Sequence, residues 1–145
     1  MIAFMDVTIN GKLDTVEINS TTADELKAYD HIIQKAGLVP INKKFDYFWI
    51  RDRDENILAF AAIYFKDCIA TFKADYTFPE YRKNGLWEIL FQYRKFICET
   101  KPEVKAIEAT CTKMSIGLYT KYGAEIVKKF KSDLWKIRIP LEKGN

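Results

Sequence analysis

FPEYRKNGLW, residues 78–87, joins an aromatic and β-branched run to an amphipathic segment, and the arrangement of the chain can be worked out from this junction. The run before it, IATFKADYTF (69–78), has the composition of a strand, and Pro79 ends that strand. After it, the apolar residues of 86–100 recur at i, i+3, i+4 and i+7, which predicts a helix. The next run, VKAIEAT (104–110), is again typical of a strand. Strand, helix and strand in this order predict a parallel pair joined by a right-handed crossover.

The remaining segments predict antiparallel pairs. Asn10-Gly11 supplies the positive φ angles of a two-residue turn, so residues 4–18 should form a hairpin. The capping pattern Thr22 to Glu25 and the breakers Gly37 and Pro40 bound a helix between them. The other expected elements are a hairpin (45–51 and 57–65), a short helix (113–122) and two strands (124–130 and 133–140) that turn at Lys131-Ser132. We therefore expect one α+β domain, residues 1–145. Its sheet should be twisted and mostly antiparallel, with about seven strands, one central parallel βαβ step and flanking helices.

Composition fits a single folded domain. Hydrophobic residues make up 48% of the 145-residue chain and charged residues 30%, which excludes disordered and low-complexity classes. No apolar run approaches the length of a membrane helix, and the first ten residues do not resemble a secretory leader. The three cysteines, an odd number without close spacing, predict reduced thiols in the core and a cytoplasmic location. One histidine, His31, cannot supply a metal cluster, so we expect no metal and no serine-hydrolase triad.

Charge is distributed unevenly along the chain. Residues 1–65 contain 7 basic and 10 acidic side chains (net −3), and residues 66–145 contain 16 and 10 (net +6). An anionic partner should therefore bind the second half.

The 78–87 junction itself has the features of a phosphate site. Backbone N–H groups at the start of a helix lack partners within that helix, and the helix dipole adds positive potential there. Arg82 and Lys83 lie beside these groups in the sequence, and Gly85 allows close approach of the backbone to a ligand. Because a charged loop with one glycine is often only a connection, this signal needs a second motif.

Two motifs together resemble a known family. PEYRKNGLW (79–87) resembles the coenzyme A pyrophosphate loop of the GNAT superfamily of N-acyltransferases, whose pattern is Arg/Gln-x-x-Gly-x-Gly/Ala, and LYTKYGAE (118–125) resembles that superfamily's second signature. The element order is similar over nearly the whole chain. The resemblance implies acyl transfer, most simply acetyl transfer, from acetyl-coenzyme A as co-substrate to a primary amine. The amine, carried by a small molecule or a peptide, would attack directly in a ternary complex.

The resemblance also implies roles for individual residues. The residues implied to bind coenzyme through their backbone are Tyr76, Thr77 and Phe78 along the pantetheine arm and Arg82, Lys83, Asn84, Gly85, Leu86 and Trp87 around the pyrophosphate, with Thr112 at a further pantetheine position. Tyr119 matches the position of the general acid that protonates the departing thiolate. Asp75 is our choice for the base that deprotonates the amine, and Glu80 and Glu108 are its alternatives.

Some positions depart from the family pattern. Trp87 replaces a glycine or alanine, and its indole either obstructs the coenzyme or turns to the core beside Phe91. Together with Thr112, Ser115 and Ala124, it motivates an alternative function: a non-catalytic binding or structural module of a larger, phage-type assembly. For either function, the candidate partners include a second copy of the chain in a homo-oligomer and a larger assembly.

A basic cluster in the second half admits two interpretations. It comprises Lys113, Lys121, Lys128, Lys129 and Lys131. Lysines that protect a strand edge from pairing explain it better than a nucleic-acid surface, which stays an alternative. We expect no membrane partner.

Overall fold

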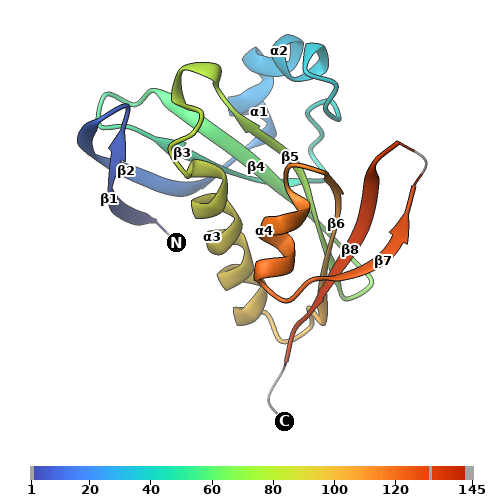
Figure 1. Cartoon of the computed structure of the whole chain (residues 1–145). Helices are drawn as coiled ribbons and strands as arrows, with labels where there is room; N and C mark the ends of the chain where they lie inside the picture. Colours follow the sequence, from blue (N-terminus) through green and yellow to red (C-terminus); the bar gives the residue numbers. More distant parts are fainter. Residues whose placement is uncertain (1, 131, 143–145) are drawn as a thin grey trace.

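The computed structural model describes residues 2–130 and 132–142 and contains one eight-stranded sheet (Figure 1). The strands are β1 (Ala3–Ile9), β2 (Lys12–Thr21), β3 (Asp46–Arg51), β4 (Ile57–Lys66), β5 (Ile69–Thr77), β6 (Ala106–Thr112), β7 (Glu125–Lys129) and β8 (Leu134–Pro140). The α-helices are α1 (Ala23–Leu26), α2 (Asp30–Lys35), α3 (Leu86–Thr100) and α4 (Ile116–Lys121). The spatial order of the strands is β1-β2-β3-β4-β5-β6-β8-β7, which confirms the α+β class. The sheet has eight strands where about seven were expected.

The parallel step lies inside an otherwise antiparallel sheet, as the sequence predicts. β5 and β6 are parallel, and α3 is the crossover between them. Their ladder is short, because it pairs only residues 69–71 with residues 106–108. Beyond Thr71 and Glu108 the two strands have no ladder between them, and a gap begins there.

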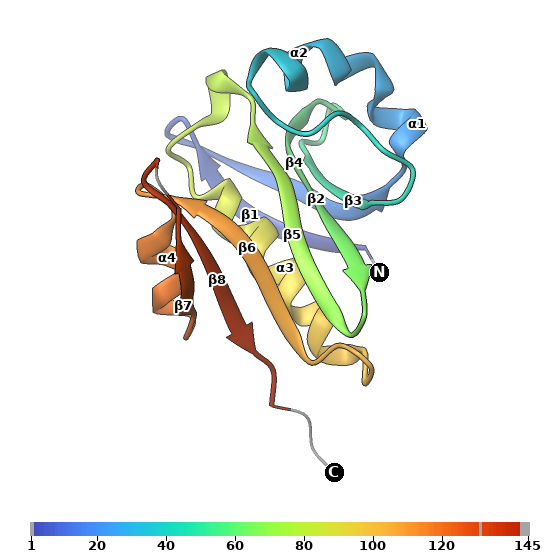
Figure 2. The same ribbon diagram turned by 90° about the vertical axis from the view of Figure 1, so that its right-hand side faces the viewer.

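Helices cover the two faces of the sheet unequally (Figures 1 and 2). α3 and α4 lie on one face, where the larger core cluster includes Phe91 and Tyr119. α1 and α2 lie on the opposite face and cover the first half of the sheet with a smaller cluster around Trp49 and Phe60. This division follows the strand sequences, because β3 and β4 are apolar on both faces whereas β8 alternates.

Two sequence-based expectations need correction. The single helix expected between residues 22 and 37 is divided, because a 3₁₀ turn, Lys27–Tyr29, separates α1 from α2. The break lets both Leu26 and Ile33 reach the sheet with no exposed surface, so packing overrides the local helical pattern.

The second correction concerns the cysteines. Cys98 and Cys111 are buried as expected, but Cys68 is exposed at the turn between β4 and β5. Asp67 and Cys68 both have positive φ, as a two-residue hairpin turn requires, and such a turn lies at the surface.

Two lysines of the basic cluster lie at a sheet edge. Lys128 and Lys129 are exposed on β7, which is an edge strand, so the edge interpretation is supported for these two. Lys121 instead forms an ion pair with Glu88. Lys131, with the turn predicted at Lys131-Ser132, lies outside the described residues. Over residues 2–130 and 132–142, none of the helices combines the length and apolarity that a bilayer crossing requires.

Candidate active site

A cleft of about 580 Å³ opens where β5 and β6 separate. Its walls come from the end of β5, the loop before α3, the first turn of α3 and the connection from β6 into α4. The lining residues are Asp75, Tyr76, Thr77, Arg82, Lys83, Trp87, Thr112, Met114, Ser115 and Leu118. The crevice expected beside the parallel step is therefore present.

A bulge in β5 sets the direction of the side chains at this cleft. The register between β4 and β5 shifts between Phe60 and Ala62, and Ala74 has a φ of 56°. Ala74 packs with the smaller cluster under α1 and α2, and the next residue, Asp75, faces α3 on the other side. The extra residue thus directs Asp75 into the cleft.

The 79–85 loop leads into α3, and no side chain caps the N-terminus of this helix. After the 3₁₀ turn Pro79–Tyr81, Lys83 and Gly85 both have positive φ, and no side chain caps Gly85 at the start of α3. Within the described chain, the backbone N–H groups from Lys83 to Glu88 donate to no other protein group. A β-carbon at Gly85 would meet no atom within 4 Å, so its φ of 75° is what favours glycine there. The loop is thus an open array of donors.

Two cationic side chains lie at this array. Arg82 and Lys83 are exposed and line the cleft. Arg82 Nε donates to the backbone oxygen of Thr77 at 3.0 Å, and its guanidinium lies 5.6 Å from the ring centroid of Tyr76. The guanidinium of Arg82 therefore lies beside the end of β5, so its positive charge is close to both the strand and the loop.

Asp75 forms an ion pair with a buried arginine. Its Oδ1 lies 2.7 Å from Nη2 of Arg94, a residue of α3 with no exposed surface. Arg94 Nη1 also donates to the backbone oxygen of Ala62, at the register shift of β4, at 3.1 Å. The Asp75 side chain keeps 22% of its surface exposed and lines the cleft. Burial raises the pKa of Asp75, and this effect exceeds the opposing effects of Arg94 and of a hydrogen bond with Trp87.

Trp87 is part of the cleft wall. Its ring stacks on Phe91 with centroids 5.8 Å apart and planes 15° apart, and it meets Tyr119 edge-on at 5.4 Å. The indole also lowers the pKa of the neighbouring Asp75 carboxyl group. The indole thus turns to the core beside Phe91, the second orientation that the sequence left open, and the cleft remains open next to it.

Tyr119 lies beneath this wall. It is 2% exposed, with its ring against Trp87 and Phe91. Burial, with a further effect of the Asp75 charge, raises the pKa of Tyr119, so its phenol is neutral over the whole physiological range. The side chain therefore holds a proton near the Asp75 carboxylate.

The predicted residues fall into two groups around the cleft. Those that line it are Asp75, Tyr76, Thr77, Arg82, Lys83, Trp87 and Thr112. Those that do not are Tyr119, buried behind Trp87; Leu86, in the core; Phe78, packed on the opposite face with Tyr29; and Asn84 and Gly85, in the loop backbone.

The alternative bases are less suited than Asp75. Glu108 faces away from α3 and forms ion pairs with Lys136 and Arg138, and Glu80 is exposed in the 3₁₀ turn. Sequence reasoning missed Met114 and Leu118, which line the cleft from the start of α4. The sequence signal that could have predicted this was their position shortly before Tyr119 in the chain.

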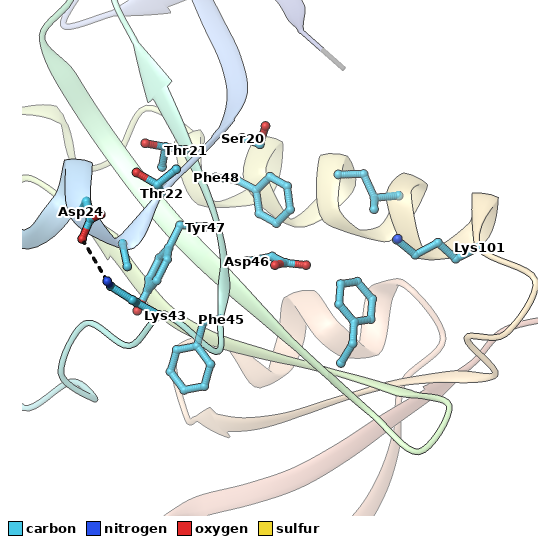
Figure 3. A pocket seen from close by; sticks show the side chains of 13 residues that line it. Ser20, Thr21, Thr22, Asp24, Lys43, Phe45, Asp46, Tyr47, Phe48 and Lys101 are labelled. Carbon is cyan, nitrogen blue, oxygen red and sulfur yellow. Dashed lines mark ion pairs between the residues drawn. The ribbon is translucent and has the colours of Figure 1, made fainter.

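Two other hollows differ in their position relative to this cleft. One, of about 490 Å³, lies at the opposite end of the sheet, and the ion pair of Asp24 with Lys43 lies at its edge (Figure 3). None of the predicted site residues lines it. The other, of about 480 Å³, lies beside α2, where His31 and Lys35 line it with Tyr76. Because Tyr76 lines both this hollow and the cleft, the two adjoin across one side chain.

The structure has the fold of the GNAT N-acetyltransferases, so the fold implied by the two motifs is confirmed. It is similar to ribosomal-protein-S18-alanine N-acetyltransferase from Escherichia coli, with a TM-score of 0.73 and 18% sequence identity over 90% of this chain and 96% of that chain. Spermidine N-acetyltransferase from Vibrio cholerae gives a TM-score of 0.70 at 12% identity, over 86% of this chain and 93% of that chain.

A third solved structure carries the family name. An acetyltransferase of the GNAT family from Staphylococcus aureus gives a TM-score of 0.63 at 14% identity, over 86% of this chain and 99% of that chain. No protein-family model and no curated protein matches the sequence. At these identities the likeness establishes the fold, and the chemistry has to be argued from the cleft.

Proposed function

We propose that this protein transfers an acyl group, most simply acetyl, from acyl-coenzyme A to a primary amine. The observation that carries the proposal is the cleft between the separated parallel strands. It has free backbone N–H groups and two cationic side chains at one end, and the Asp75 carboxylate with the neutral Tyr119 behind it at the other. A long ligand with an anionic end and a reactive end matches this polarity.

Coenzyme A would lie along the cleft in one direction. Its pyrophosphate would accept hydrogen bonds from the backbone of residues 83–88, with Arg82 and Lys83 beside it. Its pantetheine arm would run along residues 75–77 of β5, which form no ladder with β6. Thr112 faces this arm from the other wall. The thioester would then lie close to Asp75.

The reaction would proceed by direct attack in a ternary complex. Asp75 accepts a proton from the ammonium group, directly or through water, and the raised pKa of Asp75 suits it to that task. The neutral amine nitrogen bonds to the thioester carbon and the carbon–sulfur bond breaks. The nitrogen loses its second proton to solvent as the amide forms. Tyr119 would supply the proton for the departing thiolate. Because it lies behind Trp87 and does not line the cleft, this proton would have to be relayed, for example by water. Tyr119 then regains a proton from solvent, while Asp75 releases its own. No cysteine nucleophile takes part, and positioning of the two substrates supplies much of the rate.

The amine would approach through the hollow beside α2. That hollow adjoins the cleft at Tyr76, so an acceptor entering it meets the thioester from the side opposite the loop. Two solved structures of the same fold are named for alanine and spermidine acetylation, which supports an amine acceptor of peptide or small-molecule type. The absence of disulfides among three free cysteines supports a reducing compartment such as the cytoplasm.

A thermal shift experiment tests the first step. Acetyl-coenzyme A at 100 times its Kd should stabilise the fold by about 2.7 kcal/mol and raise the Tm visibly. Thiol release from acetyl-coenzyme A in the presence of a panel of peptide and polyamine acceptors then tests the transfer. An unchanged Tm at millimolar coenzyme would contradict the proposal.

A further inference from the structure

The turn of the first hairpin contacts the 79–85 loop, although 74 residues separate the two contact positions. Asn10 lies at this turn, and its preceding residue, Ile9, is buried in the larger core cluster. β1 is an edge strand, so the turn has no other strand beside it on the outer side. Burial of Ile9 thus anchors the base of the turn in the core.

The contact is a reciprocal pair of amide side chains, the Asn10–Asn84 clamp. The backbone N–H of Asn10 donates to Oδ1 of Asn84 at 3.0 Å, and Nδ2 of Asn84 donates to Oδ1 of Asn10 at 3.1 Å. Nδ2 of Asn10 donates in addition to the backbone oxygen of Glu80 at 2.9 Å. Nδ2 of Asn84 also donates within the loop, to the backbone oxygens of Tyr81 at 2.9 Å and Arg82 at 3.2 Å.

These bonds hold a loop whose own backbone gives it little support. Within the loop, Tyr81 donates to Phe78 and Arg82 donates to Pro79, and the N–H groups that follow are free. Two residues, Lys83 and Gly85, have positive φ, which is unfavourable for lysine. A segment with these features needs external contacts to keep one conformation. The clamp supplies them at both ends of the loop, at Glu80 and at Asn84.

We propose that Asn10 is a positioning residue for coenzyme binding: it holds the 79–85 loop, before the ligand arrives, in the conformation that presents the free N–H groups. This inference rests on the proposed function. Asn84 acts in the clamp through its side chain, so its contribution to the ligand is limited to its backbone. Preorganisation of this kind raises affinity because the ligand does not have to order the loop.

The test compares two glycine substitutions in hairpin turns. Asn10→Gly removes both side-chain hydrogen bonds of Asn10 and retains the left-handed backbone, for which glycine is suited. The matched control is Asp67→Gly, at a turn residue whose φ of 51° is close to the 52° of Asn10 and which lies at the other end of the sheet. The Kd of each protein for coenzyme A is measured by calorimetry, together with the Tm of the ligand-free proteins.

We expect the Kd of Asn10→Gly to rise roughly tenfold, the factor that corresponds to one or two net hydrogen bonds. The control should bind as the wild-type protein does. A second readout needs no ligand: trypsin should cleave the native Asn10→Gly protein faster after Arg82 and Lys83, which are exposed in the loop, and the control should be cleaved at the wild-type rate.

The outcomes separate the clamp from the proposed function. If wild type and Asn10→Gly bind coenzyme A equally well, the inference is overturned and the proposed function stands, even where the variant has a lower Tm. If the wild-type protein binds no coenzyme A, the proposed function is wrong, and the role of Asn10 in coenzyme binding falls with it.

Discussion

At the scale of single residues, the proposed chemistry uses two titratable groups, the carboxyl group of Asp75 and the phenol of Tyr119. Asp75 and Tyr119 both have raised pKa values for the same first cause, which is burial. Burial moves the pKa of the Asp75 carboxyl group toward neutral pH, and it keeps the Tyr119 phenol protonated. The same burial therefore makes Asp75 a better base, whereas it keeps the phenol of Tyr119 protonated and makes it a weaker acid.

Tyr119→Phe tests the proton donor. Loss of the hydroxyl should lower kcat roughly a hundredfold or more, the usual contribution of a positioned general acid, and leave coenzyme affinity nearly unchanged because Tyr119 does not line the cleft. Steady-state kinetics and calorimetry measure the two quantities. Tyr93→Phe, on α3 against Phe48, is the matched control and should retain kcat. Equal turnover of Tyr119→Phe and wild type would exclude the assigned role.

Arg94 has a structural role at the same scale. Arg94→Met would leave the Ala62 oxygen and the Asp75 carboxylate without their cationic partner, so the free energy of unfolding should fall by about 3 kcal/mol. Urea denaturation measures the change. Adding Asp75→Val should restore part of the loss, because the uncompensated charge is then removed. If Arg94→Met alone is as stable as wild type, the pair does not support the bulge of β5.

At the scale of elements, α3 and α4 are held together on the same side of the sheet as the cleft. Glu88, in the first turn of α3, accepts hydrogen bonds from the Tyr122 hydroxyl at 2.5 Å and from Lys121 at 3.0 Å. Gln92 donates to the same tyrosine oxygen. α4 has only six residues and carries Tyr119, so this link helps to orient the proposed acid, together with the packing of its ring on Trp87 and Phe91.

The link should depend on pH. Hydrogen bonding from Tyr122, with Lys121, lowers the pKa of Glu88, so its stabilising effect is complete above the ordinary glutamate pKa and is lost as the pH falls through the lowered value. Glu88→Gln should therefore cost less than about 1 kcal/mol at neutral pH and nothing in strong acid, since the side chain is one-third exposed. Urea denaturation at two pH values measures this. Glu103→Gln, exposed after α3, is the control, and equal losses for the two variants would refute the link.

At the scale of the whole molecule, the positively charged half of the chain is also the half that forms most of the cleft. The second half, with a net charge of +6, contributes most of the cleft, including the 79–85 loop and α4. The first half contributes the hairpin turn that supports the loop, and α2 beside the adjoining hollow. An anionic ligand is therefore attracted by one half and positioned with help from the other.

This distribution predicts salt-sensitive binding. The Kd for coenzyme A should rise with ionic strength, because the exposed charges of Arg82 and Lys83 are screened. Lys83→Gln should weaken binding and reduce its dependence on salt. Lys43→Gln, at the hollow on the opposite end of the sheet, should change neither. Calorimetry over a series of salt concentrations measures all three proteins, and salt-independent binding would contradict the electrostatic role.

Sequence alone determined most of the elements and the location of the cleft. Turn residues such as Asn10-Gly11, the helical period of residues 86–100 and the strand–helix–strand order are local signals, so they can be interpreted without tertiary contacts. The same local signals placed Arg82 and Lys83 at the cleft that the structure contains, and the family resemblance placed Asp75 there.

Only the tertiary structure decided how the side chains are used. The partner of Arg94 lies 19 positions away along the chain, and that of Asn10 lies 74 positions away, and no local pattern specifies such pairs. The orientation of Trp87 was open for the same reason, because its ring contacts with Phe91 and Tyr119 depend on how α3 and α4 pack against the sheet. Local sequence encodes backbone preference, whereas the contacts that shape the cleft form only when distant segments are brought together by burial of the core.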